Sequence, residues 1–321
     1  MAANDGLRIG LIGVPTDIGA ADRGACMGPQ ALRVAGLREA LEGLGHAVGD
    51  QGDIRGPDNP QDAPRGGFRH LPEVNAWCNA LRPSVQRGLE QGLLPIVLGG
   101  DHSISIGSIA GVADHCKAQG RPLSVIWLDA HADFNTPAST PSGNLHGMPL
   151  AALCGEIETT SPELEGGLDI VADGAVLDPE RVHLIGIRSV DAAEKAAIMG
   201  CGVKVHDMRA IDERGMVAIM RETLEAAAKA GGHLHVSFDV DFLDPPIAPG
   251  VITTVPGGAT FREAHLCMEM IHESGLLGSL DLVELNPMLD VRGQTAAVMI
   301  DMATSAFGKK IVYRGQGADG S

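Results

Sequence analysis

Short apolar segments that end abruptly at glycine, acidic or imidazole residues recur along the chain and constrain its fold most. They cover residues 7–15, 93–102, 123–128, 182–187, 233–238 and 279–287. An apolar run of this length bounded by turn residues is typical of a buried strand. Helical patterns separate these runs, and strands that alternate with helices predict a mainly parallel sheet with helices on both faces. We therefore expect an α/β fold built as a three-layer α/β/α domain.

The segments between the strands predict helices and loops. Helical patterns cover residues 28–33, 72–91, 103–119, 150–154, 192–199, 216–230, 260–274 and 295–307. Thr260 followed by Glu263 forms a capping-box pattern at one helix start. A short strand is expected at 203–206, a surface loop at 50–70, an acidic connection at 155–180 and a frayed tail at 315–321. We find no linker or internal repeat, so residues 1–321 are expected to form a single domain.

Composition excludes several classes of protein. The 321 residues contain 24 Lys and Arg against 41 Asp and Glu, a formal net charge of −17, so a nucleic-acid partner is not expected. This charge suits a cationic small substrate, although acidity is also an ordinary property of soluble proteins. The chain has no signal-peptide pattern and no apolar run long enough for a membrane span. The 6 cysteines lack Cys-x-x-Cys spacing, which favours reduced thiols in the cytoplasm.

Metal-binding side chains gather where the predicted strands end. Asp129, His131 and Asp133 follow one strand, and Asp239 and Asp241 follow another, in both cases at alternate positions. Alternate residues of an extended chain point to the same face. His102 follows a third strand, as Arg188 and Glu284 follow two more. Since the carboxyl ends of parallel strands share one edge of a sheet, these residues are expected to meet there.

This ligand set contains four carboxylates and two imidazoles and no thiolate. It favours Mn²⁺, with Co²⁺ as an alternative, over a tetrahedral zinc site. Four neighbouring negative charges repel one another unless cations neutralise them, so two metal ions are more plausible than one. Two adjacent metals can share a water and lower its pKa. A single strand-end aspartate could instead cap a helix, but the combined pattern favours a metal centre.

The motifs are similar to those of the ureohydrolase superfamily, and within it of the arginases. The resemblance spans roughly residues 9–307 and rests on four segments, at 28–33, 99–103, 129–133 and 237–245. It implies a sheet of about eight strands and two Mn²⁺ ions per subunit. By the same resemblance, one ion is held by His102, Asp129, Asp133 and Asp239, and the other by Asp129, His131, Asp239 and Asp241.

The resemblance also implies a reaction, in which a hydroxide that bridges the metals cleaves the guanidinium group of L-arginine to give L-ornithine and urea. Asp133 would accept the proton of the hydroxide, and His146 would shuttle a proton to the leaving amine. Glu284 would bind the guanidinium, with Thr253 near the same end. The remaining contacts are implied for the α-amino group, at Asp191, and for the α-carboxylate, at Asn135, Ser142 and Asn144.

Two alternatives remain open at this stage. The metal motifs are shared with agmatinases and other guanidino-acid hydrolases, although residues 142–147 are similar to the loop that binds the α-carboxylate in arginases. A non-catalytic arginine-binding relative is the other alternative, and the presence of all six ligands and His146 argues against it. Homo-oligomers, trimers or hexamers, are implied by resemblance only.

Two residues depart from the family pattern. Phe242 stands where many arginases have glycine, and Ile252 also replaces a glycine, in the segment 251–255. A β-branched residue does not easily take a positive φ. The substitution therefore bears on the shape of this loop and on the fine geometry of the pocket.

Overall fold

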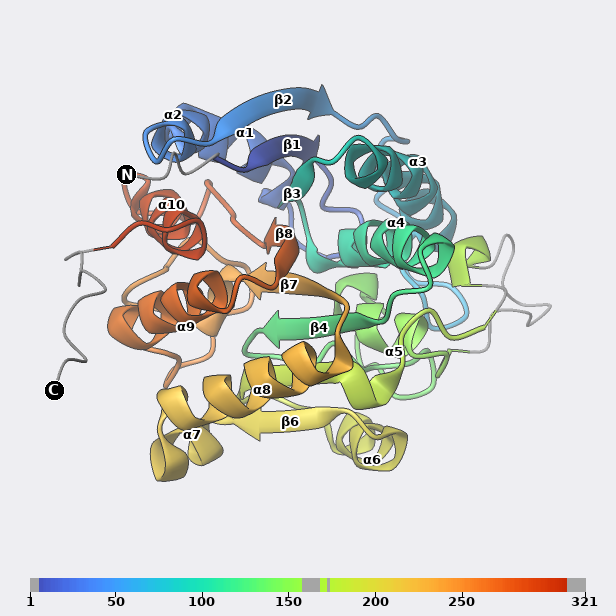
Figure 1. Ribbon diagram of the computed structural model, residues 1–321. Helices are drawn as coiled ribbons and strands as arrows, with labels where there is room; N and C mark the ends of the chain where they lie inside the picture. Colours follow the sequence, from blue (N-terminus) through green and yellow to red (C-terminus); the bar gives the residue numbers. More distant parts are fainter. Residues whose placement is uncertain (1–5, 158–167, 172–173, 311–321) are drawn as a thin grey trace, which may run out of the picture.

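A single sheet of eight parallel strands forms the centre of the molecule (Figure 1). The computed structural model describes residues 6–157, 168–171 and 174–310. The strand order is β2-β1-β3-β8-β7-β4-β5-β6. The strands are β1 (Arg8–Val14), β2 (Ala47–Asp53), β3 (Leu94–Gly99), β4 (Leu123–Leu128), β5 (Val182–Ile187), β6 (Lys204–Asp207), β7 (His233–Asp239) and β8 (Leu277–Val283).

Helices cover both faces of this sheet, as the alternating pattern predicts. One apolar core lies between the sheet and α1 (Gly28–Val34), α2 (Leu37–Glu42), α7 (Met208–Arg214), α8 (Met216–Ala230), α9 (Phe261–Ser274) and α10 (Gln294–Ala306). The other lies beneath α3 (Leu71–Glu90), α4 (Ser105–Ala118), α5 (Pro149–Leu153) and α6 (Ala192–Cys201). In Figure 1, α9 and α10 stand on one side of the sheet, and α3 and α4 on the other. The three-layer α/β/α prediction is confirmed.

Most predicted elements occur where the pattern places them. Strands β4 and β5 and helix α8 have the predicted bounds. Helix α9 begins with the expected capping box, in which Thr260 and Glu263 exchange side-chain and backbone hydrogen bonds. The predicted tail at 315–321 lies outside the described residues. Within the described ranges, no helix combines the length and the apolarity needed to cross a membrane.

The surface loop expected at 50–70 is wrong at its start, because residues 50–53 belong to the edge strand β2. The hydropathy pattern does not reveal this strand, because Val48 is its only buried residue. Strand β2 owes its place to parallel pairing with β1 and to Arg33, whose guanidinium pairs with Asp50 at 2.8 Å and with Asp53 at 2.6 Å. Helices α2 and α7 were also not predicted.

Close packing at the carboxyl edge explains the paired glycines after β3. Strand β3 ends at Gly99, and a Cβ at Gly100 would clash with the backbone oxygens of Val14, the last residue of β1, and of Thr16 just beyond it. The chain can therefore turn from β3 directly into the short 3₁₀ helix η2 (His102–Ile104). Strands β3, β8, β7, β4 and β5 are consecutive neighbours, so the five polar strand ends meet in the middle of the edge.

Candidate metal centre and active site

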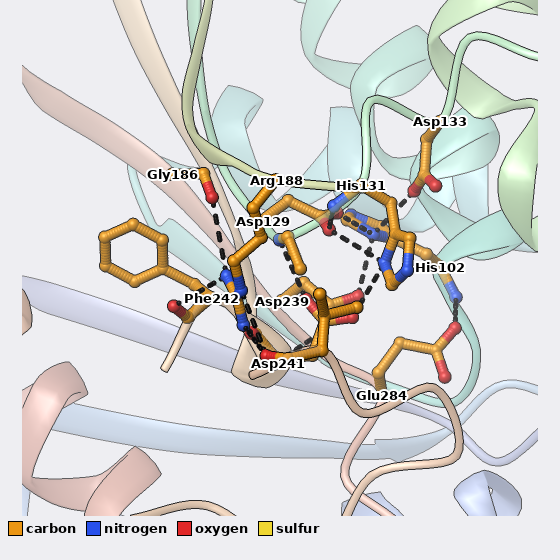
Figure 2. A network of polar contacts seen from close by, with 12 residues as sticks. His102, Asp129, His131, Asp133, Gly186, Arg188, Asp239, Asp241, Phe242 and Glu284 are labelled. Atoms are coloured by element: carbon orange, nitrogen blue, oxygen red, sulfur yellow. Dashed lines mark hydrogen bonds and ion pairs between the residues drawn. The ribbon is translucent and has the colours of Figure 1, made fainter. Parts of the chain in front are cut away.

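His102 Nδ1 lies among the carboxylates of three other predicted ligands. It is 3.1 Å from Asp129 Oδ2, 3.0 Å from Asp133 Oδ2 and 3.2 Å from Asp239 Oδ2. These residues follow the ends of β3, β7 and β4, and β8 lies between β3 and β7 in the sheet. Figure 2 shows the four side chains gathered around the site. All four are buried. The sequence pattern thus predicts correctly that they meet.

A second group adjoins the first. His131 Nδ1 is 2.9 Å from Asp241 Oδ2 and 3.5 Å from Asp129 Oδ1. Ligand atoms of His102, Asp129 and Asp239 are close enough to hold one ion, and those of Asp129, His131 and Asp241 to hold another. Asp129 belongs to both groups and lies between them in Figure 2. The two groups of candidate metal ligands therefore adjoin and share the Asp129 carboxylate.

Backbone amides hold one oxygen of each central carboxylate. The N–H of His131 donates to Asp129 Oδ1 at 2.6 Å, and the N–H of Asp241 donates to Asp239 Oδ1 at 2.8 Å. The N–H of Ala130 donates to Asp241 Oδ1 at 2.9 Å. Because the chain turns immediately after each strand, these donors orient the carboxylates toward the centre of the site.

The donor set fits a divalent cation. His102 Nδ1 is buried and has no hydrogen-bond partner, while its Nε2 contacts Ser237 Oγ at 2.8 Å. A ring nitrogen that faces three carboxylate oxygens, with its other nitrogen held by a hydrogen bond, is the usual arrangement of a metal-binding histidine. Oxygen and imidazole ligands suit Mn²⁺ or a similar ion.

The pKa values of the candidate ligands reflect how closely their charges are packed. Burial, together with the Asp241 and Asp129 carboxylates, raises the pKa of Asp239 well above its usual range. Burial and then the Asp129 carboxylate raise the pKa of Asp133 to about 7. Burial works against the charged form of His131, but Asp241 and Asp129 raise its pKa to about 12. Carboxylates packed in this way require nearby positive charge in order to stay ionised.

Trp127 supports two ligands, a role that the sequence reasoning missed. Its ring stacks on the imidazole of His102, with centroids 4.0 Å apart and an interplanar angle of 7°. Its Nε1–H donates to Asp129 Oδ2 at 2.9 Å. The sequence offered one indication, because Trp127 is an aromatic residue two positions before Asp129 in a chain with only 3% aromatic residues.

Two site residues hold left-handed backbone conformations. Asp133 has a φ of 50° and Glu284 a φ of 63°. Such values are uncommon for residues other than glycine and concentrate at functional sites, where the surrounding structure enforces them. Both side chains thereby turn inward at the strand ends, Asp133 toward His102 and Glu284 toward His102 and His146.

A cavity of about 280 Å³ opens directly above the metal ligands. All the predicted substrate residues line it, together with five of the six predicted ligands, whereas Asp129 lies buried beneath. The lining residues predicted from the sequence are His102, His131, Asp133, Asn135, Ser142, Asn144, His146, Asp191, Asp239, Asp241, Thr253 and Glu284. The cavity therefore joins the metal centre to the polar loops.

His146 and Glu284 form a close pair at the base of the cavity. His146 Nδ1 lies 2.9 Å from Glu284 Oε1, and the same oxygen accepts the backbone N–H of His102 at 2.8 Å. Burial disfavours the charged imidazole, but the Glu284 carboxylate outweighs it and raises the pKa of His146 to about 9. Burial raises the pKa of Glu284, but His146 and the His102 amide bring it below its usual value.

Residues outside the predicted set orient the polar loops. Asn135 Nδ2 donates to Asp191 Oδ2 at 3.0 Å, and the buried Glu194 accepts the backbone N–H of Asp191 at 3.0 Å. Arg69 Nε donates to Asn144 Oδ1 at 2.8 Å, and Asn144 lines the cavity. Arg69 lies in the segment expected to be only a surface loop, so the sequence carried no signal for it.

Arg188 connects the metal ligands to the loop at 251–255. Its guanidinium donates to the carbonyl oxygens of Asp241 at 2.6 Å and of Val255 at 2.8 Å. Further bonds reach the carbonyl oxygen of Leu243 at 3.2 Å and that of Phe242 at 3.3 Å, the latter shown in Figure 2. Burial lowers the pKa of Arg188. The sequence placed Arg188 at a strand end but missed that its partners are backbone carbonyls.

The two departures from the family pattern are accommodated. Ile252 has a negative φ, and Val251, Ile252 and Thr253 all line the cavity. Phe242 is fully buried, and its ring occupies the space above the backbone of Gly186, which has a φ of 95°. A Cβ at Gly186 would clash with this ring.

Gly186→Ala should therefore disturb the segment that carries Asp241. We expect a loss of stability of about 1–3 kcal/mol, because alanine is strained at this φ and overpacks the ring. Urea denaturation of the metal-free protein measures the loss. The same Gly186→Ala change should cost less stability when it is made in a Phe242→Ala background, and an equal cost in both backgrounds would show that the ring is not the obstacle. Gly200→Ala, at an open helical position, serves as the control.

Comparison with known proteins agrees with this geometry. The model of the arginase family matches residues 7–308. The chain belongs to the arginase family. The arginase of Brucella melitensis is 47% identical over 307 residues, 95% of this chain and 97% of that protein. It follows that the protein is a hydrolase of the arginase type.

Solved structures of arginase-family members support the assignment. The arginase from Bacillus caldovelox superposes with a TM-score of 0.88 at 42% identity, covering 95% of this chain and 100% of that one. The arginase of Entamoeba histolytica in complex with L-ornithine gives a TM-score of 0.83 at 31% identity, with 95% and 100% covered.

Proposed function

We propose that the protein hydrolyses L-arginine to L-ornithine and urea at a binuclear manganese centre. One observation carries the proposal, namely that a single cavity joins the two groups of metal ligands to loops bearing the side chains expected for an amino acid. The names of the relatives support the substrate, and the ornithine bound to the Entamoeba histolytica protein matches the proposed product.

The proposed ligands are His102, Asp129, Asp133 and Asp239 for one Mn²⁺, and Asp129, His131, Asp239 and Asp241 for the other. When bound, the two ions supply a water of lowered pKa that can attack the guanidinium carbon near neutral pH. Asp133 would accept the proton of this water. His146 carries a proton between solvent and the leaving amine, and its partial exposure and contact with Glu284 suit that role.

Substrate orientation is assigned to the polar lining of the cavity. Glu284 pairs with the guanidinium, with Thr253 at the same end, and a buried carboxylate is a strong partner for a planar cation. The α-amino group is assigned to Asp191. The α-carboxylate is assigned to the donors of Asn135, Ser142 and Asn144. The net charge of −17 favours the approach of cationic arginine.

Three further attributes belong to the proposal. They are the use of Mn²⁺ in both sites, a location in the cytoplasm, and a homo-oligomeric state of three or six subunits. Metal analysis of the purified protein and its mass in solution test the first and the third.

The decisive experiment is a urea-release assay after preincubation with Mn²⁺, on arginine, agmatine and guanidinobutyrate side by side. Agmatine lacks the α-carboxylate and guanidinobutyrate lacks the α-amino group. Each would leave polar groups of the cavity without a partner, so we expect arginine to be preferred by about 100-fold or more in kcat/KM. Faster turnover of agmatine or guanidinobutyrate would contradict the assignment and favour another ureohydrolase activity. Arginine binding without urea release would indicate a non-catalytic relative.

A further inference from the structure

The two strands at the middle of the sheet turn polar side chains toward α4. On β7, Leu234, Val236 and Phe238 join the apolar core on one face, whereas His233, His235 and Ser237 alternate with them and face the other way. On β8, Ser279 and Asp281 lie on that same second face, and all five of these polar residues are buried. Buried polar groups lower the stability of a protein unless they are hydrogen-bonded, so the presence of these five polar side chains in the core needs an explanation.

Asp281 collects hydrogen bonds from the side of the metal centre. Its Oδ2 accepts Ser105 Oγ at 3.0 Å and also the hydroxyl of Ser108, both on α4. Ser105 Oγ lies 3.4 Å from Ser237 Oγ, which in turn lies 2.8 Å from His102 Nε2. Asp281 is thus connected through two hydroxyls to a ligand of the metal centre, although it touches no ligand itself.

A second series of contacts reaches Asp281 from the opposite edge of the sheet. His235 Nε2 lies 3.4 Å from Asp281 Oδ2, and His235 Nδ1 lies 2.9 Å from Ser279 Oγ. Ser279 Oγ also contacts His233 Nε2 at 2.8 Å. These contacts lie along the first part of β7, and His235 Nε2 lies within ion-pair distance of the Asp281 carboxylate without a hydrogen bond to it.

The chemistry of the groups sets the direction of the bonds. A carboxylate only accepts hydrogen bonds, so the Ser105 hydroxyl must donate to Asp281 and is left to accept from Ser237. Ser237 has then used its proton and must accept from His102 Nε2–H. In a neutral imidazole with a proton on Nε2, the Nδ1 atom carries the lone pair, and Nδ1 is the atom that faces Asp129, Asp133 and Asp239.

We propose that Asp281 is a positioning residue for the metal centre, which acts through Ser105 and Ser237 to hold His102 in the tautomer whose Nδ1 binds metal. Outer-sphere partners of this kind orient metal-binding histidines and raise their affinity for the ion. Here the outer-sphere connection runs from His102 through the hydroxyls of Ser237 and Ser105 to the carboxylate of Asp281 in the middle of the sheet. The inference rests on the proposed metal centre.

Ser105 and Ser108 provide a matched pair of variants. Both are fully buried residues of α4, and both donate to the same Asp281 oxygen, but Ser105 alone connects onward to Ser237. Mn²⁺ binding to the full-length Ser105→Ala and Ser108→Ala variants is measured by competition with a metal chelator. Metal content and the electron paramagnetic resonance of the Mn²⁺-loaded proteins report whether one ion or a coupled pair is bound.

For Ser105→Ala, we expect the affinity of one of the two Mn²⁺ sites to fall by about 10- to 100-fold, with loss of the coupled signal. Ser108→Ala should retain both ions with an affinity within about 3-fold of the unchanged protein, since that range lies below the usual outer-sphere effect. Ser237→Ala should reproduce the loss seen in Ser105→Ala. The melting temperatures of metal-free Ser105→Ala and Ser108→Ala should fall by similar amounts, because each loses its hydrogen bond to Asp281 and the further contact of Ser105 with Ser237 is long, at 3.4 Å.

Equal affinity in Ser105→Ala and Ser108→Ala, whether both bind weakly or both bind normally, would overturn the role given to Asp281. If the unchanged protein failed to bind two Mn²⁺ ions, the proposed metal centre would itself be wrong. The two failures are distinguished by the unchanged protein alone.

Discussion

Asp129→Asn will lose bound metal and hydrolytic activity together. Asp129 is shared by both groups of ligands, and the amide of asparagine has less charge and directs N–H groups where a cation needs an acceptor. Removing a direct metal ligand should lower activity more than removing an outer-sphere partner does, so we expect activity to fall by at least about 100-fold. Metal content per chain should fall from two ions to one or fewer. Elemental analysis and urea release on the same sample measure both quantities.

Asp207→Asn is the matched control for this change. Asp207 also closes a strand of the sheet, β6, but it caps α7 by accepting the Ala210 N–H at 2.8 Å and lies apart from the ligands. Asparagine is nearly as good a helix cap as aspartate, so metal content and activity should stay unchanged. If Asp129→Asn kept two ions at full occupancy, the assignment of Asp129 as the shared ligand would be wrong.

Glu284→Gln will lower kcat/KM for arginine by about 10²- to 10³-fold, which corresponds to removing one partner of a buried charge pair. Glutamine retains the size of Glu284 and an oxygen that can accept the His102 N–H, but it lacks the charge that pairs with a guanidinium. It also removes the carboxylate that raises the pKa of His146, so that pKa should fall from about 9. Steady-state kinetics with arginine measures the loss.

A ligand without a guanidinium group tests which part of the substrate Glu284 contacts. 2-Aminopentanoate keeps the α-amino and α-carboxylate groups of arginine but has no guanidinium, so its inhibition constant should change much less than the KM for arginine. Equal losses for both molecules would show that Glu284 acts on the whole cavity and not on the guanidinium. Glu263→Gln, a capping residue of α9, controls for the removal of a carboxylate elsewhere.

The fold could be predicted wherever a strand is buried. Strands β4, β5 and β7 are buried along their entire length, so apolar residues dominate β4 and β5, and in β7 they alternate with His233, His235 and Ser237. The edge strand β2 has one buried residue and carries no such pattern. It is a strand because β1 offers it a row of backbone partners, which is a property of the assembled sheet.

The site could be predicted to the extent that its residues follow strand ends. The six proposed ligands stand at the ends of β3, β4 and β7, and those strands are close neighbours in the sheet. Trp127, Arg69 and Arg188 were missed as supporting residues because each acts on a partner that is distant along the chain or lies in the backbone. Arg69, for example, contacts Asn144 across 75 positions of sequence.

The sequence by itself determined the layers of the fold, the identity of the proposed ligands and the edge of the sheet at which they meet. It could do so because burial and strand periodicity are local properties of the chain. Tertiary structure alone decided that Gly186 makes room for Phe242 and that Asp281 is connected to His102. Those relations depend on which strands become neighbours and on how side chains from separate elements fill the same space.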